Sequence, residues 1–233
     1  MKLAHAVVLI TGANRGIGAA FAREALARGA RRVYAGARDP SSVQIPGVQA
    51  IALDVTDPGQ VARVASACGD VTLVINNAGI AQPGGFLQDG ALENTRRQLE
   101  VNFFGMLRMA QAFGPVLAAN GGGALLNVLS IASWVHRPLL GTYGATKAAA
   151  WALTNGLRHE LRAQGTQVSA LHMGFVDTDL TRGIEMPKSS PEAIVRFALD
   201  GLEAGVEEIL ADDATRQVKQ SLSLAVPAYL AAA

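Results

Sequence analysis

The segment TYGATKAAA, residues 142–150, places a tyrosine and a lysine four positions apart among small residues. Four residues make just over one helical turn, so Tyr143 and Lys147 would be neighbours on the surface of a helix. A phenol is a poor base at neutral pH, but an adjacent ammonium group favours the phenolate and predicts a lowered pKa. The pair is therefore suited to general acid–base catalysis. Taken alone, an ordinary amphipathic helix with its polar side in water is the simpler explanation.

A second segment, TGANRGIG at residues 11–18, follows an apolar run and opens a helical pattern. Its glycines, Gly12, Gly16 and Gly18, permit a tight turn and let backbone N–H groups approach a ligand closely. The helix N-terminus behind them offers unpaired donors and a partial positive charge, which suit a diphosphate. The position after the first strand favours a dinucleotide site over a turn that merely connects two elements. No Gly-Lys-Ser/Thr ends the segment, so it is not a P-loop.

The end of the second predicted strand reads GARD, residues 36–39. A carboxylate at this position holds the ribose 2′-hydroxyl of NAD, whereas an arginine accommodates the 2′-phosphate of NADP. Because residues 32–37 read as strand to their end, we expect Arg38 to face the ribose, with Arg15 as a second cationic partner. This predicts NADP(H). A shift by one residue would present Asp39 instead, and both arginines could also be solvated surface charges.

The elements that must position these groups alternate along the chain. Apolar runs without polar alternation predict strands covered on both faces, at 6–10, 32–37, 48–54, 71–76, 124–130 and 167–173, with a further strand at 207–212. Helical segments are expected between them, at 17–28, 57–68, 92–119, 143–164 and 190–204. The alternation predicts an α/β fold, a Rossmann-type doubly wound parallel sheet with helices on both faces, in one domain spanning 1–233.

The composition narrows the classes of function. A formal net charge of +1 predicts neither nucleic acid nor an anionic membrane as partner. No apolar stretch approaches the ~20 residues needed to span a bilayer. Cys68 is the only cysteine, which excludes an internal disulfide and predicts a cytoplasmic protein. The four histidines show no metal-ligand spacing, so no metal is expected.

Together the motifs resemble the compact, single-domain short-chain dehydrogenases/reductases, from about residue 5 to residue 180. The resemblance is carried by TGANRGIG (11–18), LDV (53–55), NNAG (76–79), VNFFG (101–105), YGATK (143–147) and GFVDT (174–178). Ser130 lies thirteen residues before Tyr143, which is the usual family interval. The sequence departs from the family pattern at Met173, where the family has proline, and it lacks the family's glycine-rich C-terminal end.

The resemblance implies hydride transfer from a nicotinamide, with the protein supplying the proton. Tyr143 matches the catalytic acid/base, Lys147 its partner, Ser130 the hydroxyl that holds the carbonyl, and Asn102 the proton-relay residue. With the residues named above, the expected cofactor contacts are Gly12, Asn14, Arg15, Gly16, Ile17, Gly18, Arg38, Asp54, Val55, Asn76, Ala78, Gly79, Tyr143, Lys147, Gly174, Val176 and Thr178.

Substrate specificity is expected from loops near 80–90, 132–141 and 179–190. The candidate walls of an apolar pocket, each equally plausible as packing, are Trp134, Leu139, Leu140, Phe175 and Met186. The expected function is an NADPH-dependent carbonyl reductase, or an alcohol dehydrogenase in reverse. Its substrate would be a small ketone or alcohol, and the resemblance implies a homodimer or homotetramer.

Two alternatives share the fold. A non-catalytic NADP(H)-binding sensor or assembly partner would have no use for the intact set of Ser130, Tyr143 and Lys147. A sugar epimerase or dehydratase fits neither the glycine spacing nor the short C-terminal part.

Overall fold

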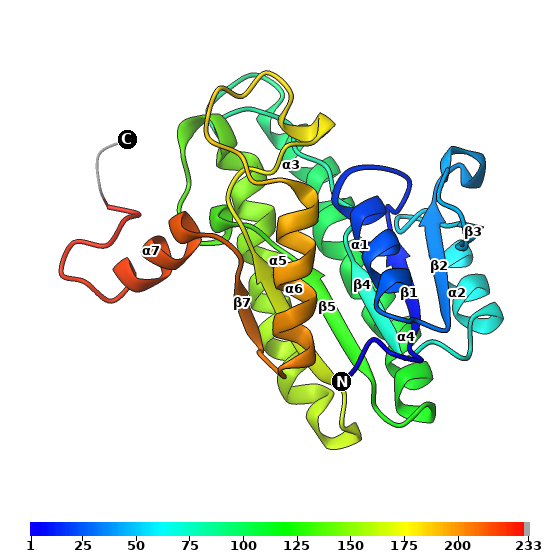
Figure 1. The fold of residues 1–233 in the computed structure, drawn as a ribbon. Helices are drawn as coiled ribbons and strands as arrows, with labels where there is room; N and C mark the ends of the chain where they lie inside the picture. The colour runs from blue at the N-terminus through cyan, green and yellow to red at the C-terminus, as the bar shows by residue number, and fades with distance from the viewer. Residues whose placement is uncertain (231–233) are drawn as a thin grey trace.

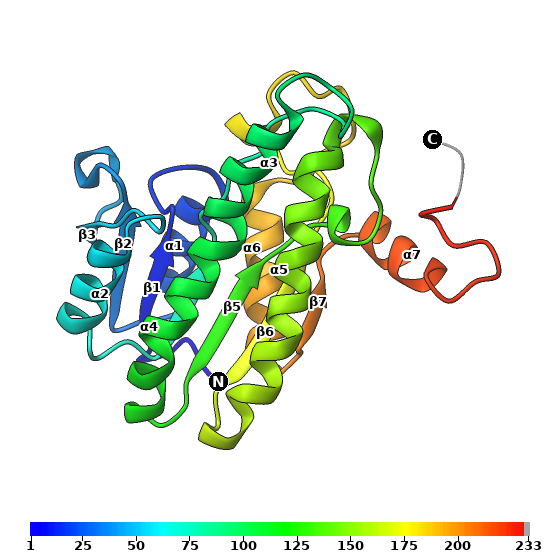
Figure 2. The ribbon, with the colours of Figure 1, turned by 180° about the vertical axis from the view of Figure 1, so that it is seen from behind.

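A computed structural model describes residues 1–230 and shows a seven-stranded sheet with helices on both faces (Figures 1 and 2). Every pairing between neighbouring strands is parallel. The strands are β1 (Val7–Thr11), β2 (Arg32–Ala37), β3 (Gln49–Ala52), β4 (Leu73–Asn76), β5 (Ala124–Val128), β6 (Gln167–His172) and β7 (Glu208–Leu210). The fold predicted from the sequence is confirmed. The last three residues of the predicted domain, 231–233, lie outside the described residues.

The strand order is β3-β2-β1-β4-β5-β6-β7. The chain therefore builds the sheet outward from β1 to β3, returns, and continues outward from β4 on the other side of β1. Where the two directions diverge, the carboxyl ends of β1 and β4 leave a crevice in which such folds bind ligands.

Two layers of helices cover the sheet because each strand buries side chains on both faces. Val8 and Ile10 pack on the side of α1 (Gly16–Ala27) and α6 (Pro191–Glu203), which lie in front in Figure 1. The alternate residues, Val7 and Leu9, pack on the opposite side. The helices of that side, in front in Figure 2, are α2 (Pro58–Ala67), α4 (Met106–Ala119) and α5 (Gly141–Glu160).

The single long helix predicted at 92–119 is interrupted. It consists of α3 (Ala91–Leu99), a π-helical turn (Glu100–Gly105) and α4. Such turns occur mostly inside α-helices and often at functional sites. A further helix, α7 (Asp213–Ser221), was not predicted.

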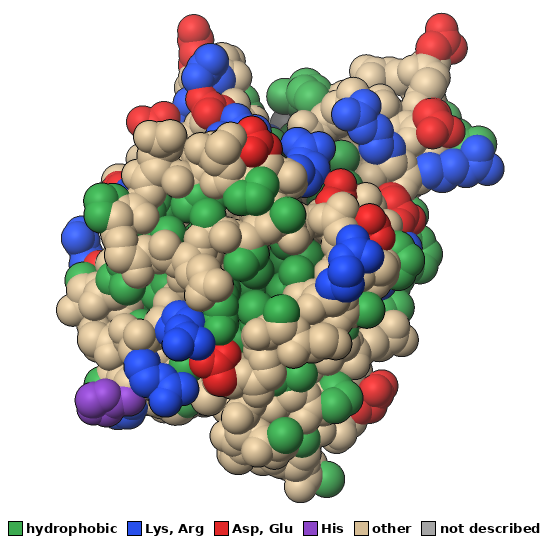
Figure 3. Space-filling model, turned by 90° about the vertical axis from the view of Figure 1, so that its right-hand side faces the viewer, with side chains coloured by type: hydrophobic (Ala, Val, Ile, Leu, Met, Phe, Trp, Pro, Cys, Tyr) green, Lys and Arg blue, Asp and Glu red, His purple; other side chains and the backbone are tan. Residues whose placement is uncertain are grey.

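The prediction that every strand is covered on both faces is wrong for β3. Three of its four residues are exposed because β3 is an edge strand. Lysine and arginine side chains stand beside exposed apolar atoms on this side of the molecule (Figure 3). Among residues 1–230, no helix has both the length and the apolar character that crossing a bilayer requires.

Candidate active site

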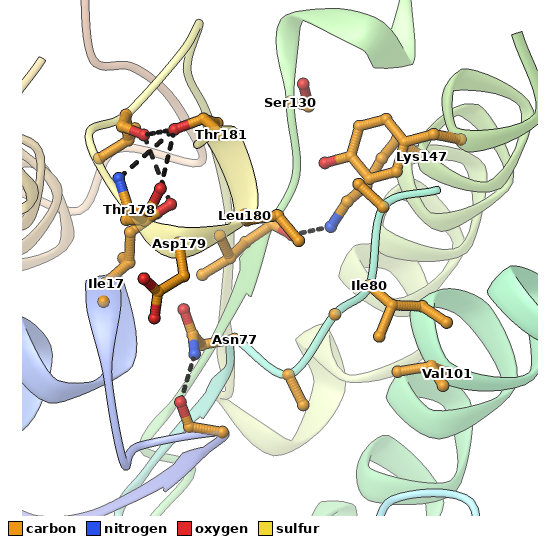
Figure 4. Close-up of a pocket in the computed structure, with 18 of the residues that line it drawn as sticks. Ile17, Asn77, Ile80, Val101, Ser130, Lys147, Thr178, Asp179, Leu180 and Thr181 are labelled. Atoms are coloured by element: carbon orange, nitrogen blue, oxygen red, sulfur yellow. Dashed lines mark hydrogen bonds between the residues drawn. The ribbon is translucent and has the colours of Figure 1, made fainter. Parts of the chain in front are cut away.

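A cavity of about 1180 Å³ opens at the carboxyl ends of the strands. Its walls come from the segments after the first six strands, β1 to β6, from helices α3 and α5 and from the π-helical turn. Ile17 and Thr178 lie on one side of it, and Lys147, Ile80 and Val101 lie on the other (Figure 4). Single-ligand pockets usually measure about 300–1,000 Å³, so this cavity has room for a dinucleotide and a second, smaller molecule.

The glycine loop has the geometry of a phosphate cradle. Gly12 adopts φ = +65°, a conformation that glycine allows without strain. Helix α1 begins at Gly16 without a side-chain cap, so its first N–H groups face the cavity without a side-chain acceptor. Gly18 does not line the cavity, which corrects its prediction as a cofactor contact. A Cβ there would lie 2.2 Å from the Gly12 carbonyl oxygen, so Gly18 lets the helix pack under the turn.

Thr11 and Asn77, neither of which was predicted, fasten the glycine loop to the end of β4. The Thr11 hydroxyl accepts hydrogen bonds from the Asn77 and Ala78 N–H groups at 3.0 and 2.9 Å. The Asn77 amide donates to the Thr11 and Gly12 carbonyl oxygens at 2.9 and 3.0 Å. One hydrogen bond from Asn77 is drawn in Figure 4. The second asparagine of the NNAG motif was the signal that could have found this role.

Asn76, the first asparagine of that motif, was predicted as a cofactor contact, and the structure corrects this. Its side chain is buried and donates to the Asn127 Oδ1 at 2.9 Å. The Asn127 amide in turn donates to the Thr154 hydroxyl at 2.9 Å. The chain of side-chain amides joins β4, β5 and α5 beneath the cavity.

The end of β2 presents Arg38 to the cavity. The neighbouring Asp39 also lines it, but its Oδ1 accepts from the N–H and hydroxyl of Ser41 at 2.9 and 2.7 Å. These hydrogen bonds lower the pKa of Asp39. Arg15 forms an exposed ion pair with Asp179 at 2.8 Å across the cavity mouth.

Ser130, Tyr143 and Lys147 line the same cavity as the glycine loop. Lys147 is only 5% exposed, and its Nζ donates to the Val128 carbonyl oxygen at 2.8 Å. The Nζ lies 5.8 Å from the centre of the Tyr143 ring. The Ser130 hydroxyl, at the end of β5, accepts from the Ala132 N–H at 3.1 Å. The helical spacing predicted for Tyr143 and Lys147 therefore sets them side by side in α5.

Burial favours the neutral forms of both Tyr143 and Lys147, and so it shifts their pKa values in opposite directions. It raises the pKa of Tyr143 to about 12, and a hydrogen bond with Ser130 opposes this rise. It lowers the pKa of Lys147 to about 8. The lowered phenol pKa predicted from the sequence is thus wrong for the protein without ligand, because the loss of solvation on burial outweighs the opposing hydrogen bond with Ser130.

Asn102 lies in the π-helical turn and does not line the cavity. Its Oδ1 accepts from the Ile80 N–H at 2.9 Å, and its amide donates to the Ile80 carbonyl and the Thr146 hydroxyl at 2.9 Å each. This fully buried side chain joins the segment after β4 to α5, one turn from Tyr143. The proton-relay role stays a prediction.

The small residues around Tyr143 permit a close approach. A Cβ at Gly144 would lie 2.3 Å from His136 Cδ2 and 3.1 Å from the Ala132 carbonyl oxygen. Glycine therefore lets α5 pack directly against the segment that carries Ser130.

The other predicted cofactor contacts on the cavity wall are Asn14, Gly16, Ile17, Asp54, Val55, Ala78, Gly79, Gly174, Val176 and Thr178.

Of the predicted substrate walls, Leu139, Leu140 and Phe175 line the cavity, but Trp134 and Met186 do not. Trp134 is 6% exposed and stacks on His172, with ring centres 4.0 Å apart. Met186 is 55% exposed. Pro83, Leu180 and Ile184 line the cavity from the loops predicted near 80–90 and 179–190, whereas nothing in the sequence pointed to Glu93, Arg96 and Arg97 of α3.

Comparison with known proteins agrees with this geometry. Residues 6–188 match the model of the short chain dehydrogenase family. Dehydrogenase/reductase SDR family member 7B of Bos taurus is 31% identical over 195 residues. That match covers 76% of this chain but only 60% of the bovine protein's length.

Two solved structures from Burkholderia species share the fold. A short chain dehydrogenase from Burkholderia cenocepacia in complex with NADP is 38% identical, with a TM-score of 0.93 over 97% of this chain and 95% of that one. A short chain dehydrogenase/reductase from Burkholderia phymatum in complex with NAD has a TM-score of 0.84 over 95% of each chain. At 22% identity, the second similarity concerns the fold alone. The chain therefore belongs to the short-chain dehydrogenase/reductase family, whose oxidoreductases use a nicotinamide cofactor to interconvert hydroxyl and carbonyl groups.

Proposed function

We propose that this protein reduces a ketone with NADPH, or oxidises the corresponding secondary alcohol in reverse, with Tyr143 as the acid/base. The observation that carries the proposal is the shared cavity. Ser130, Tyr143 and Lys147 line it together with an uncapped glycine loop that fits a diphosphate. When bound, the nicotinamide supplies the hydride.

In this proposal the Ser130 hydroxyl donates a hydrogen bond to the substrate oxygen and holds it beside the Tyr143 hydroxyl. Donors aimed at a developing alkoxide are worth about 3 kcal/mol in other enzymes. Tyr143 then delivers its proton to that oxygen. The raised pKa of Tyr143 keeps the phenol protonated at neutral pH, as reduction requires. Lys147 stabilises the phenolate that remains, since a nearby positive charge favours the ionised form.

A preference for NADPH is supported by the end of β2. Arg38 lines the cavity there, and the neighbouring carboxylate of Asp39 is held by Ser41. The 2′-phosphate would meet a guanidinium whose planar donors suit it. The similar Burkholderia cenocepacia structure contains NADP, which also favours this assignment.

The substrate end of the cavity supports an uncharged ketone with an apolar body. Next to Tyr143 lie Leu139 and Leu140, and Phe175, Leu180 and Ile184 come from the segment after β6. Apolar walls with a few convergent polar groups are typical of small-molecule sites.

A non-catalytic NADP(H)-binding protein is the weaker reading. Burying the Lys147 ammonium costs free energy, as its lowered pKa indicates, and a protein that only binds the cofactor has no use for Lys147 together with Ser130 and Tyr143. We also propose a cytoplasmic homodimer or homotetramer in which α4 and α5 pair between subunits. These helices lie side by side on one face of the molecule (Figure 2). Light scattering coupled to gel filtration would measure its mass, and a monomer would contradict this assembly.

The function is tested by measuring the oxidation of NADPH and of NADH, followed by their absorbance, with a series of ketones and aldehydes as substrates. We expect turnover with an apolar ketone and a higher kcat/KM with NADPH. Turnover only with NADH would contradict the cofactor assignment. An absence of turnover with either cofactor, in a protein that still binds NADP, would favour the non-catalytic alternative.

A further inference from the structure

Helix α7 was not predicted from the sequence patterns, and it lies outside the residues 6–188 that match the family model. It begins directly after β7 and lies beyond the edge of the sheet (Figure 1). The residue before it, Asp212, is its N-cap, and Asp212 Oδ1 accepts from the Thr215 N–H at 2.8 Å. This is the ordinary hydrogen bond of a helix cap.

The second oxygen of the same carboxylate makes a contact outside the helix. Asp212 Oδ2 accepts from the Gly174 N–H at 2.7 Å. Gly174 lines the cavity in the segment after β6, which carries Val176 and Thr178. A short hydrogen bond from a backbone N–H to a carboxylate is stronger than one between neutral groups. One side chain therefore joins the start of α7 to the wall of the cavity.

The contact lies one residue after Met173, where proline would restrict the backbone. Proline fixes φ and reduces the conformations that the chain must give up on folding, whereas methionine does neither. Ile131 donates to the Met173 carbonyl oxygen at 2.9 Å, so the segment is tied to the end of β5 on one side. The Gly174 N–H is the next backbone group along the chain, and Asp212 holds it.

The C-terminal end of α7 is held by contacts with the rest of the fold, which fix the position of the helix that Asp212 caps. Lys219 Nζ lies 2.6 Å from Glu208 Oε2. It also lies 4.9 Å from the centre of the Trp134 ring and 5.5 Å from that of Trp151. An ion pair combined with two cation–π contacts fixes the helix more firmly than an isolated surface pair.

We propose that Asp212 is a positioning residue, which holds the segment 174–178 in the conformation that orients the nicotinamide. The inference rests on the proposed function and on the cofactor contacts that the family resemblance implies for Gly174, Val176 and Thr178 in this segment. Asp212 acts through the Gly174 backbone and touches neither substrate nor cofactor. Asp212 thereby restricts the backbone of this segment, as a proline at position 173 would.

The variant Asp212→Asn tests this without removing the helix cap. Asparagine caps as well as aspartate, but its NH2 group takes the place of one carboxylate oxygen, so one of the two N–H groups would face a donor instead of an acceptor. Asp213→Asn is the matched control, because Asp213 lies one residue further on and is exposed. Among residues 1–230, its carboxylate forms an ion pair only with Arg216 of the same helix.

The first readout is hydrogen exchange in the protein without cofactor. We expect the Gly174 amide to exchange at least about tenfold faster in Asp212→Asn and unchanged in Asp213→Asn. A tenfold change corresponds to about 1.4 kcal/mol, close to the lower end of what a hydrogen bond to a charged group contributes. Unchanged exchange in Asp212→Asn would overturn the inference. This arm does not depend on turnover, so it decides the contact even if the proposed function fails.

The second readout is the deuterium kinetic isotope effect with NADPH labelled at nicotinamide C4. We expect kcat to fall about tenfold or more, because small misplacements of reacting atoms are costly, while the Kd of NADPH changes less than about twofold. The isotope effect should rise because hydride transfer becomes rate-limiting. A lower kcat with an unchanged isotope effect and a lower melting temperature would show a merely structural role and overturn the inference.

Discussion

The two sides of the cavity are built differently. The glycine wall (Gly12–Ile17 together with Arg38) is mainly backbone, and its charged side chains are exposed. The tyrosine wall consists of side chains, of which Ser130 and Lys147 are buried and Tyr143 is half-buried, and the loss of solvation there shifts two pKa values. The contrast shows that groups that bind the cofactor can remain in contact with water, whereas groups that transfer a proton must lose part of their solvation.

The substitution Tyr143→Phe should have the largest effect because it removes the proton donor from the tyrosine wall. We expect kcat for ketone reduction to fall about a thousandfold, within the range for general acid–base catalysis. The Kd of NADPH should change little, since the glycine wall is intact. Tyr229→Phe, at an exposed tyrosine, is the control. Activity retained in Tyr143→Phe would refute the acid assignment.

The free energy of unfolding tests the burial of the tyrosine wall. The pKa of Lys147 is lowered to about 8 from 10.5, so above pH 8 the unfolded chain binds more protons than the folded one. Stability from this group therefore rises with pH between about 8 and 10, by up to about 3 kcal/mol. Lys147→Met should remove this rise and be more stable at pH 7. Equal pH dependence in both proteins, measured by urea unfolding, would contradict the burial argument.

The glycine wall should be changed most by Arg38→Asp. We expect the ratio of the Kd values for NADPH and NADH to rise about thirtyfold, as expected when one charged hydrogen-bond partner is lost. Arg63→Ala serves as the control, because Arg63 lies near Arg38 but outside the main cavity. Equal weakening of both cofactors would refute a 2′-phosphate contact.

The smallest effect concerns the ion pair that joins the glycine loop to the segment after β6. Asp179 holds Arg15 at 2.8 Å, and both side chains are substantially exposed. Exposed pairs are worth about 0–1 kcal/mol, so Asp179→Asn should tighten NADPH binding about threefold by freeing Arg15 for the phosphate. The gain should disappear at high salt. Weaker binding in titration calorimetry would mean that Asp179 supports the site.

Most of the glycine wall was predictable because its signals are local. The spacing of Gly12, Gly16 and Gly18 fixed the loop, and the strand predicted at 32–37 has the same bounds as β2. Gly18 and Asn76 were misplaced because spacing does not tell a residue that faces the ligand from one that packs beneath it.

The tyrosine wall was predictable in its residues but not in its energetics. The helical spacing of Tyr143 and Lys147 is local, whereas their pKa values depend on burial by segments far away in the sequence. Trp134 was misplaced for the same reason, since its partner His172 comes from β6. The role of Asp212 depends on a contact with Gly174 across 38 residues, which no local pattern contains.

The central claim is that the Tyr143 hydroxyl passes its proton to a substrate oxygen next to the nicotinamide. A crystal structure of the protein with NADP⁺ and a secondary alcohol measures this geometry directly. We predict that the alcohol oxygen lies within about 3 Å of Tyr143 Oη, with its carbon facing nicotinamide C4. A dinucleotide bound elsewhere, or an alcohol oxygen remote from Tyr143, would contradict the account.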